Sequence, residues 1–295
     1  MDVPSSFGFG AQQPKDYGRT RFEDVAREKD ADLDVALGAA LIARDAYPDL
    51  DVAEIPKALD RLAAPLFGER LEEASAEEQA ERLRERIYGD SPGAGFRGNE
   101  SDYYDPKNSL ISDVLTRKLG IPLSLAIVYC EVARRVGVPA RGVGFPGHFL
   151  VRIERPSSTG AKALIVDPFF QGRSLAEEEL LARLSRALGG TDVEAHLVPV
   201  SPRAILVRML TNLKAIYLTR NERARAHLAV DRISSLLPHA AGPLVERGLL
   251  AVQLGAKESA RSDLTRALTL HPSDNEARLA REALAKLEKV RSTLN

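Results

Sequence analysis

His148 and Asp167 are the residues of this chain best placed for acid–base chemistry. His148 follows Gly147 at the start of a predicted strand, HFLVRIE, and Asp167 ends the next predicted strand, ALIVD. Because side chains alternate along a strand, we expect His148 to share a face with Leu150 and Arg152. An aspartate on a neighbouring strand can fix the tautomer of a histidine, as it does in hydrolytic triads. The pair is therefore either part of a catalytic site or a hydrogen bond that only stabilises the fold.

A nucleophile for this pair would have to come from the predicted helix that opens at Pro122. Cys130 lies eight residues further on, about 12 Å along the helix axis, among apolar residues that disfavour a thiolate. Ser124 lies nearer the helix start, but on a helical wheel it shares a stripe with Glu131 and Arg135, roughly opposite Pro122. We expect that stripe to face solvent or another domain. Cys130 is predicted to be a core residue and Ser124 a polar residue near a helix start, although both remain candidates for the nucleophile.

The loop before this helical region carries polar and aromatic residues in the pattern SDYYDPKNS. Asp102, Tyr103, Tyr104, Asp105 and Asn108 could line a cleft above the helix. Equally, they could be turn residues with two aromatic anchors. Asn108 is also placed to cap the next predicted helix.

The composition excludes several classes of function. The formal net charge is −1 at pH 7, so the chain lacks the basic surface of a nucleic-acid binder. A single cysteine excludes internal disulfides and cysteine-only metal sites, and GVGFPG lacks the strand–helix context of a phosphate-binding loop. The longest nearly unbroken apolar stretch, 121–133, is too short to span a bilayer, and the N-terminus shows no secretory signal. We expect a cytoplasmic protein with no cofactor, metal, nucleic-acid or membrane partner, and its oligomeric state stays open.

The chain has 295 residues, 44% of them hydrophobic, enough for one large or two small domains. Residues 1–20 are rich in Pro, Gly, Ser and Gln and are predicted to form a disordered leader. Three helical patterns follow within the N-terminal helical region, 21–98. In the next region, 99–200, an apolar helix precedes the strands VPARGVG, HFLVRIE and ALIVD. The expected class is α+β, with a helical N-terminal region, a core of one helix and an antiparallel sheet, and C-terminal helices.

The C-terminal region, 201–295, shows an internal repeat. Pro238 and Pro272 are 34 residues apart. Five apolar or small residues have counterparts at the same offset: Leu210, Tyr217, Ala226, Val230 and Ile233 correspond to Leu244, Ala251, Ala260, Leu264 and Ala267. This pattern is typical of tetratricopeptide repeats, and an ordinary helical bundle is the alternative. The predicted units span 201–237 and 242–270, with a closing helix over 274–289. So short an array is expected to pack against the preceding domain and to offer a concave binding surface.

The motifs SDYYDPKNSLISDVL and LGIPLSLAIVYCEVARRVGVPARGVGFPGHFLVR, with the VDPF ending, resemble the SirB family. That family pairs a transglutaminase-like domain with tetratricopeptide repeats, and the resemblance covers roughly residues 33–272. It implies a papain-like core in which His148 matches the catalytic histidine, and Asp167 with Pro168 match the aspartate and its proline. Pro122, in GIP where a true transglutaminase-like site has GVC, stands at the position of the cysteine. Proline has no nucleophilic atom.

We therefore predict a degenerate, non-catalytic transglutaminase-like protein that acts in protein–protein interaction or regulation. Its repeats would bind a protein or peptide partner, and its degenerate cleft could hold an extended chain without cutting it. The alternative is a cysteine-protease-like hydrolase or acyl transferase that uses His148 and Asp167 with Ser124, Cys130 or a water molecule. A purely structural component of an assembly is a third possibility. Only the enzyme requires the pair to lie beside an open, polar cleft, whereas a binding protein predicts a groove on the repeats or an apolar cover over the histidine.

Overall fold

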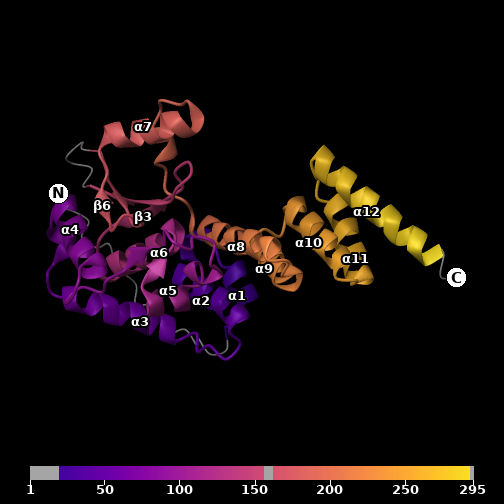
Figure 1. Cartoon of the computed structure of the whole chain (residues 1–295), viewed down its shortest axis with the longest axis horizontal. Coiled ribbons are helices and arrows are strands. Elements are labelled where there is room, and N and C mark those ends of the chain that lie inside the picture. The colour runs from indigo at the N-terminus through magenta and orange to yellow at the C-terminus, as the bar shows by residue number, and fades with distance from the viewer. Residues whose placement is uncertain (1–19, 156–161, 293–295) are drawn as a thin grey trace, which may run out of the picture.

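The computed structural model describes residues 20–155 and 162–292, and it combines many α-helices with a small sheet. In Figure 1 the N-terminal helices and the sheet form a rounded body from which the C-terminal helices extend as an arm. The predicted leader, 1–20, lies outside the described residues except for Thr20, and so does the predicted SSTG loop. The fold class is α+β, as the sequence indicates.

The three predicted helical patterns of the N-terminal region are helices α2 to α4. The helices of this region are α1 (Phe22–Arg27), α2 (Val35–Ala46), α3 (Glu54–Ala63) and α4 (Ala76–Tyr88). Two of them begin with a side-chain cap, because Asp34 accepts a hydrogen bond from the backbone N–H of Leu37, and Ser75 accepts one from that of Glu78. The starts of α2 and α4 therefore follow from ordinary capping chemistry.

The central region begins with a short parallel ladder and two helices. Its elements are β1 (Arg97–Gly98), α5 (Ile111–Arg117), β2 (Leu119–Gly120) and α6 (Pro122–Arg135), and β1 pairs with β2. Helix α6 is buried nearly all round, as predicted, and Gly137 adopts a positive φ of 75° just beyond it. One expectation is wrong: Asn108 does not cap α5, which begins three residues later and has Leu110 at its cap position. Asn108 instead ends a short 3-10 turn.

A four-stranded antiparallel sheet follows α6, in the order β3-β4-β5-β6. Its strands are β3 (Ala140–Val143), β4 (Leu150–Ile153), β5 (Leu164–Asp167) and β6 (Arg173–Ser174). One face packs into the main core with α6 through Val151, Ile153 and Val166. The other face packs under α7 (Glu177–Leu188) through Leu150 and Ile165. The first three strands are the predicted ones, whereas β6 and the β1–β2 ladder are too short for a periodic signal.

The C-terminal region consists of two antiparallel helix pairs and a closing helix. These are α8 (Pro202–Thr219), α9 (Arg223–Leu236), α10 (Ala241–Gln253), α11 (Lys257–Leu268) and α12 (Asp274–Ser292). All ten residues that correspond at the 34-residue offset are buried, so the sequence period marks the packed face of each pair. The first pair joins the main core through Leu206, Leu210 and Val230. The second pair and α12 form a separate cluster around Leu244 and Leu264.

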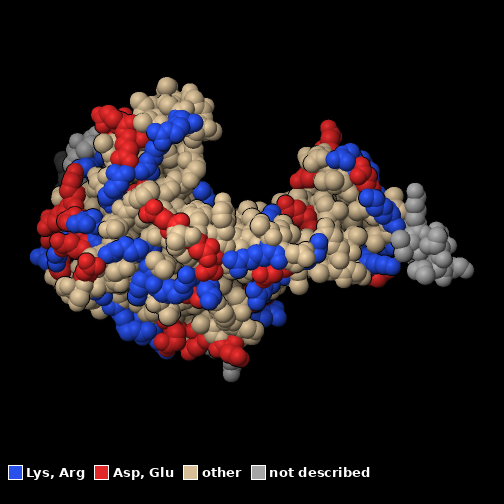
Figure 2. All heavy atoms as spheres, viewed as in Figure 1, with Lys and Arg blue, Asp and Glu red and all other residues tan. Residues whose placement is uncertain are grey.

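The surface carries both signs of charge. On the face seen in Figure 2, acidic and basic side chains are interspersed, and a hollow separates the α7 side of the body from the arm. No helix within residues 20–155 and 162–292 is long and apolar enough to cross a membrane.

Candidate functional site

His148 and Asp167 meet at the end of the sheet, as the sequence predicts. The Nε2 atom of His148 lies 2.7 Å from Oδ1 of Asp167. His148 stands in the turn before β4, directly after Gly147, whose φ of 71° favours glycine. Asp167 is the last residue of β5 and is fully buried. No residue in the described part of the chain hydrogen-bonds the other ring nitrogen of His148.

The Asp167 carboxylate is shared among several donors. Arg183 of α7 donates to its Oδ2 at 3.0 Å, and the backbone N–H of Phe169 donates to its Oδ1 at 3.1 Å. Burial opposes ionisation of this carboxyl, but the hydrogen bonds and charges of His148 and Arg183 together lower its pKa. The aspartate therefore ties the histidine turn to α7 as well as orienting the ring.

Arg183 is a site residue that the sequence reasoning missed. It lies 16 residues after Asp167, in a helix whose placement over the sheet depends on the packing of Leu180 and Leu184. Nothing in the local sequence around Arg183 marks it as a partner of a buried carboxylate. It is itself held by Glu179, whose pKa falls to about 2 through the hydrogen bond from Arg173 and, against some burial, the contacts with Arg183.

Aromatic rings surround the histidine. Phe169 meets the His148 ring edge-on with centroids 6.0 Å apart, and Phe170 stacks on it at 6.2 Å. Tyr103, from the loop before the core, packs edge-on against Phe169 at 6.2 Å. Only 15% of the His148 side chain is exposed. Aromatic groups therefore cover most of the His148 ring.

The start of α6 holds no nucleophile directed at the histidine. Pro122 is the first residue of the helix, at the position that the resemblance assigns to a cysteine. The Oγ atom of Ser124 accepts a hydrogen bond from the N–H of Ile121 at 3.1 Å and donates one to the carbonyl of Asn108 at 2.5 Å. The single hydroxyl proton is therefore engaged, and Ser124 acts as an internal link.

The stripe that contains Ser124 does not face solvent, contrary to one of the two expectations for it. Ser124 and Glu131 are only 2% and 7% exposed. Arg135 pairs with Asp60 of α3 at 2.6 Å and with Glu131 at 2.6 Å. Because α3 packs along this side of α6, the polar residues are buried as paired groups.

Asn108 links the loop to the start of α6. Its Nδ2 atom donates to the carbonyl of Asp102 at 2.6 Å, and its Oδ1 accepts from Nδ2 of Asn99 at 3.0 Å. Both asparagines are buried. Among the loop candidates, Tyr103 packs against Phe169 beside His148, and Tyr103, Phe169 and Phe170 are called the aromatic cover below. Asp105 instead stabilises the turn by accepting a hydrogen bond from the N–H of Lys107 at 3.0 Å. Asn99 was not predicted to be a site residue, because its role depends on a partner nine residues away.

Cys130 lies in the middle of α6, away from its N-terminus. The residue is partly buried and packs against the main core, and burial raises the pKa of its thiol. No hydroxyl or thiol side chain in the described residues hydrogen-bonds His148. Within the same residues, no group of three or more His, Cys, Asp or Glu side chains is arranged to hold a metal ion.

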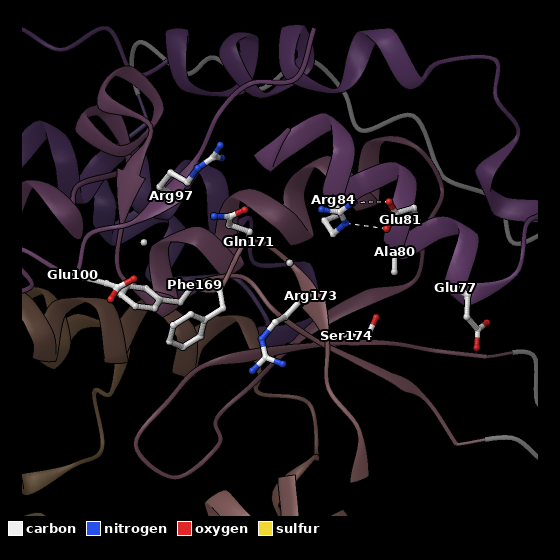
Figure 3. A pocket seen from close by; sticks show the side chains of 13 residues that line it. Glu77, Ala80, Glu81, Arg84, Arg97, Glu100, Phe169, Gln171, Arg173 and Ser174 are labelled. Carbon is white, nitrogen blue, oxygen red and sulfur yellow. Dashed lines mark hydrogen bonds and ion pairs between the residues drawn. The ribbon is translucent and has the colours of Figure 1, made fainter. Parts of the chain in front are cut away.

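A pocket of about 590 Å³ opens beside the aromatic cover. It lies between α4, β1, the turn after β5, and β6, and Phe169 and Phe170 form part of its wall (Figure 3). The pair and the pocket thus share a boundary made of the two phenylalanines.

Comparison with known proteins relates two parts of the chain to two families. A model of the transglutaminase-like superfamily matches residues 53–211, and a tetratricopeptide repeat model matches residues 213–285. A UPF0162 protein of Xylella fastidiosa (strain 9a5c) is 40% identical over 275 residues, which cover 92% of this chain and 95% of that protein. A UPF0162 protein of Pseudomonas aeruginosa is 32% identical over 254 residues, which cover 85% of this chain and 89% of that protein. F-box only protein 21 of Mus musculus is 36% identical over 126 residues, which cover 41% of this chain and 19% of that protein. No solved structure matches the chain.

Proposed function

The chain belongs to the UPF0162 family, with a transglutaminase-like domain and tetratricopeptide repeats, and we propose that it is a non-catalytic member that acts by binding another protein. The SirB resemblance is part of this proposal. One observation carries it: the start of α6 has Pro122 where a nucleophile is expected, and the nearby Ser124 hydroxyl is engaged with the Asn108 carbonyl. Acyl transfer through a covalent intermediate needs a nucleophile within reach of its base.

In this proposal the His148–Asp167 pair has a structural role, which is to connect neighbouring elements of the fold. Asp167 connects the turn before β4 to α7 through Arg183. On the other side, Arg208 of α8 donates to the backbone carbonyl of His148 at 3.0 Å and lies over the Phe149 ring at 5.0 Å. The histidine turn is therefore held between α7 and the first repeat helix.

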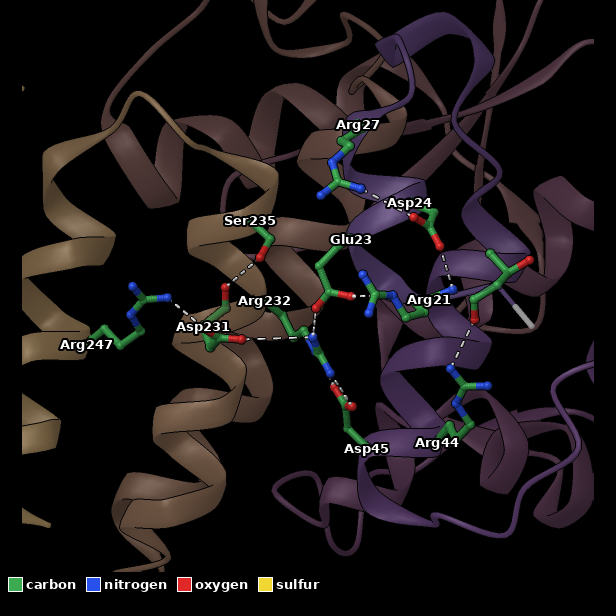
Figure 4. A network of polar contacts seen from close by, with 11 residues as sticks. Arg21, Glu23, Asp24, Arg27, Arg44, Asp45, Asp231, Arg232, Ser235 and Arg247 are labelled. Atoms are coloured by element: carbon green, nitrogen blue, oxygen red, sulfur yellow. Dashed lines mark hydrogen bonds and ion pairs between the residues drawn. The ribbon is translucent and has the colours of Figure 1, made fainter. Parts of the chain in front are cut away.

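The first repeat pair is held firmly to the N-terminal helices, which suits a rigid binding surface on that pair. Arg232 of α9 bonds both carboxylate oxygens of Asp45 in α2, at 2.8 and 2.9 Å, and also contacts Glu23 of α1 (Figure 4). The neighbouring Asp231 accepts a hydrogen bond from Arg247 of α10 at 2.6 Å. We propose 201–295 as the recognition region, with 21–98 and 99–200 as its support, in a cytoplasmic protein.

A groove on the first repeat pair is our candidate for the partner surface. It has a volume of about 460 Å³ and is mostly apolar. Its lining residues are Ser201, Arg203, Ala204, Val207, Arg208, Thr211 and Leu237. A groove on the repeats is what a binding protein predicts, and the apolar lining suits the hydrophobic face of a partner helix.

The absence of catalysis can be tested with the intact protein. We would measure incorporation of a fluorescent amine into casein and labelling by fluorophosphonate and iodoacetamide probes, for the native protein and for H148Q. The expected result is no amine incorporation and no rapid labelling in either protein. Labelling of Ser124 or Cys130, or amine transfer, that H148Q abolishes would establish the enzyme instead.

The binding role can be tested by affinity purification with cross-linking from the source cells. Thr211→Arg places a long cation in the groove, and Thr219→Arg makes the same change further along α8, where Thr219 is also exposed and also bonds the carbonyl four residues before it. We expect partners to be retained by H148Q and Thr219→Arg and lost with Thr211→Arg. Partners that depend on His148 and not on Thr211 would contradict the assignment of binding to the repeats.

A further inference from the structure

The pocket beside the aromatic cover has two features that point to an extended peptide. The first is the free edge of the sheet. Strand β6 is the outermost strand, and the Leu175 N–H bonds the Ile165 carbonyl at 2.8 Å. Because N–H and C=O groups alternate in direction along an antiparallel strand, Ser174 turns its own peptide groups away from β5. Ser174 is exposed and lines the pocket.

Strand β1 presents a second free edge to the same pocket. The N–H groups of Arg97 and Asn99 bond the carbonyls of Lys118 and Gly120, at 2.8 and 2.9 Å. Gly98, between them, therefore directs its peptide groups away from β2, and it also lines the pocket. Two outward-facing backbone edges along one pocket can pair with the backbone of an extended chain.

The second feature is the negative charge of Glu100, because the other charged side chains that line the pocket have partners. Each of its arginines is engaged: Arg84 pairs with Glu81 at 2.6 Å, Arg173 bonds Glu179, and Arg97 bonds Asp90 at 3.0 Å.

Of the acidic lining residues, Glu81 is paired in this way and Glu77 bonds Arg155 at 3.2 Å. Glu100 is exposed, and within the described ranges no hydrogen bond or ion pair engages it. In Figure 3 it lies at the end of the pocket beside Phe169, away from Ser174. A cationic side chain there would meet the Glu100 carboxylate beside the largely buried ring of Phe169.

We infer that this pocket binds an extended segment of a partner protein, which pairs with the β6 edge at Ser174 and places a lysine or arginine at Glu100. The site is separate from the groove on the repeats, and it rests on the proposed function only in that the chain is held and not cut. Phe170, 42% exposed, would contact apolar side chains that alternate with the basic one.

The test begins with a display selection of random 12-residue peptides on the full-length protein. Enriched peptides would be synthesised, and their dissociation constants measured by fluorescence polarisation for wild type and variants. Glu100→Lys reverses the charge, and Ser174→Pro removes the outward N–H at an edge position that tolerates proline. The matched controls are Glu288→Lys, an exposed glutamate on α12, and Ser174→Ala, which keeps the N–H.

We expect enriched peptides to carry a basic residue, and each pocket variant to weaken binding roughly tenfold, with both controls within about twofold of wild type. Hydrogen exchange of the wild-type complex should slow at the amides of Gly98 and Ser174, which tests the site even if Ser174→Pro is unstable. Failure to enrich any peptide, or peptides that bind both pocket variants as tightly as wild type, would overturn the inference. Mass spectrometry of bound peptides separates the two proposals, because a bound peptide that is cleaved keeps this site but contradicts the non-catalytic function.

Discussion

The candidate site has two sides that differ in the groups they present: the strand ends, which carry His148 and Asp167, and the start of helix α6. On the strand side, Nε2 of His148 and Oδ1 of Asp167 lie at hydrogen-bonding distance, so the aspartate orients the ring. On the helix side, Pro122 occupies the start of α6, and Ser124 and Asn108 form a buried hydrogen bond there. A histidine–aspartate pair is therefore poor evidence for catalysis by itself, because the same contact also fastens a turn to a helix.

The physical reason for the difference is the number of partners. A catalytic aspartate needs only to orient its histidine, but Asp167 also neutralises Arg183 and accepts a backbone N–H. Removing it would leave Arg183 paired with Glu179 and would take away the acceptor of the His148 ring and of the Phe169 N–H. In the proposed non-catalytic protein, the contacts of the strand side would therefore serve stability.

The largest expected effect is that of Asp167→Ala. We expect it to lower the free energy of unfolding by about 3 kcal/mol at pH 7, measured by urea denaturation. The buried carboxylate accepts hydrogen bonds from His148, Arg183 and the Phe169 N–H, and all three are lost. The matched control is Asp49→Ala at an exposed position, with an expected change below about 0.5 kcal/mol.

The same variant has a defined pH dependence. The pKa of Asp167 is lower in the folded protein than in the unfolded chain, so its contribution is complete above the unfolded value, near pH ~4. The contribution is lost as the pH falls through the folded pKa. The difference between wild type and Asp167→Ala should therefore narrow below about pH 4. A difference that stays constant into acid would show that the ionised carboxylate contributes nothing.

The second effect tests the helix side. Asn108→Ala removes the donor to the Asp102 carbonyl and the acceptor for Asn99, and it should cost about 2 kcal/mol in urea denaturation. Asn275→Ala, at an exposed position on α12, is the control. If Asn108→Ala and Asn275→Ala lower the free energy of unfolding by the same small amount, the hydrogen bonds of Asn108 do not stabilise the loop before α6.

Ser124→Ala should have a smaller effect, about 1 kcal/mol, because the Ile121 N–H and the Asn108 carbonyl each lose one hydrogen bond. The comparison is sharpened by His148→Gln, which should leave the stability cost of Ser124→Ala unchanged. Residues without shared partners add independently. A coupling energy above about 0.5 kcal/mol in this double-mutant cycle would show that the two sides act together, as an active site requires.

Much of this architecture could be predicted from the sequence, because it follows from periodicity. The 34-residue offset identified the buried positions of both helix pairs, and the strand ends at His148 and Asp167 gave the pair. Arg183 and Arg208 could not be predicted as its neighbours, since their positions depend on how α7 and α8 dock on the sheet.

The errors have the same origin. An asparagine directly before a helix is a reasonable cap, but α5 begins three residues after Asn108, which instead bonds Asn99 and Asp102. A helical wheel gave the correct stripe for Ser124 and Glu131, but not the groups that cover it. Asn108 bonds Ser124, and Asp60 of α3 pairs with Arg135 next to Glu131. Local patterns specify faces, whereas tertiary packing decides which of them is buried.

The smallest expected effect concerns Cys130, the remaining candidate nucleophile. Burial raises the pKa of its thiol, so little thiolate forms near neutral pH, and the surrounding core restricts access. The native protein should therefore react slowly with iodoacetamide and rapidly once it is unfolded in urea. Labelling followed by intact-mass spectrometry measures both rates, and Cys130→Ala controls for reaction at other residues. Rapid stoichiometric labelling of the native protein, faster than that of a free thiol, would mean that α6 offers an activated cysteine after all. Helix α6 would then carry a nucleophile at Cys130 in place of one at Pro122, and the helix side would no longer differ from the strand side in lacking a catalytic group.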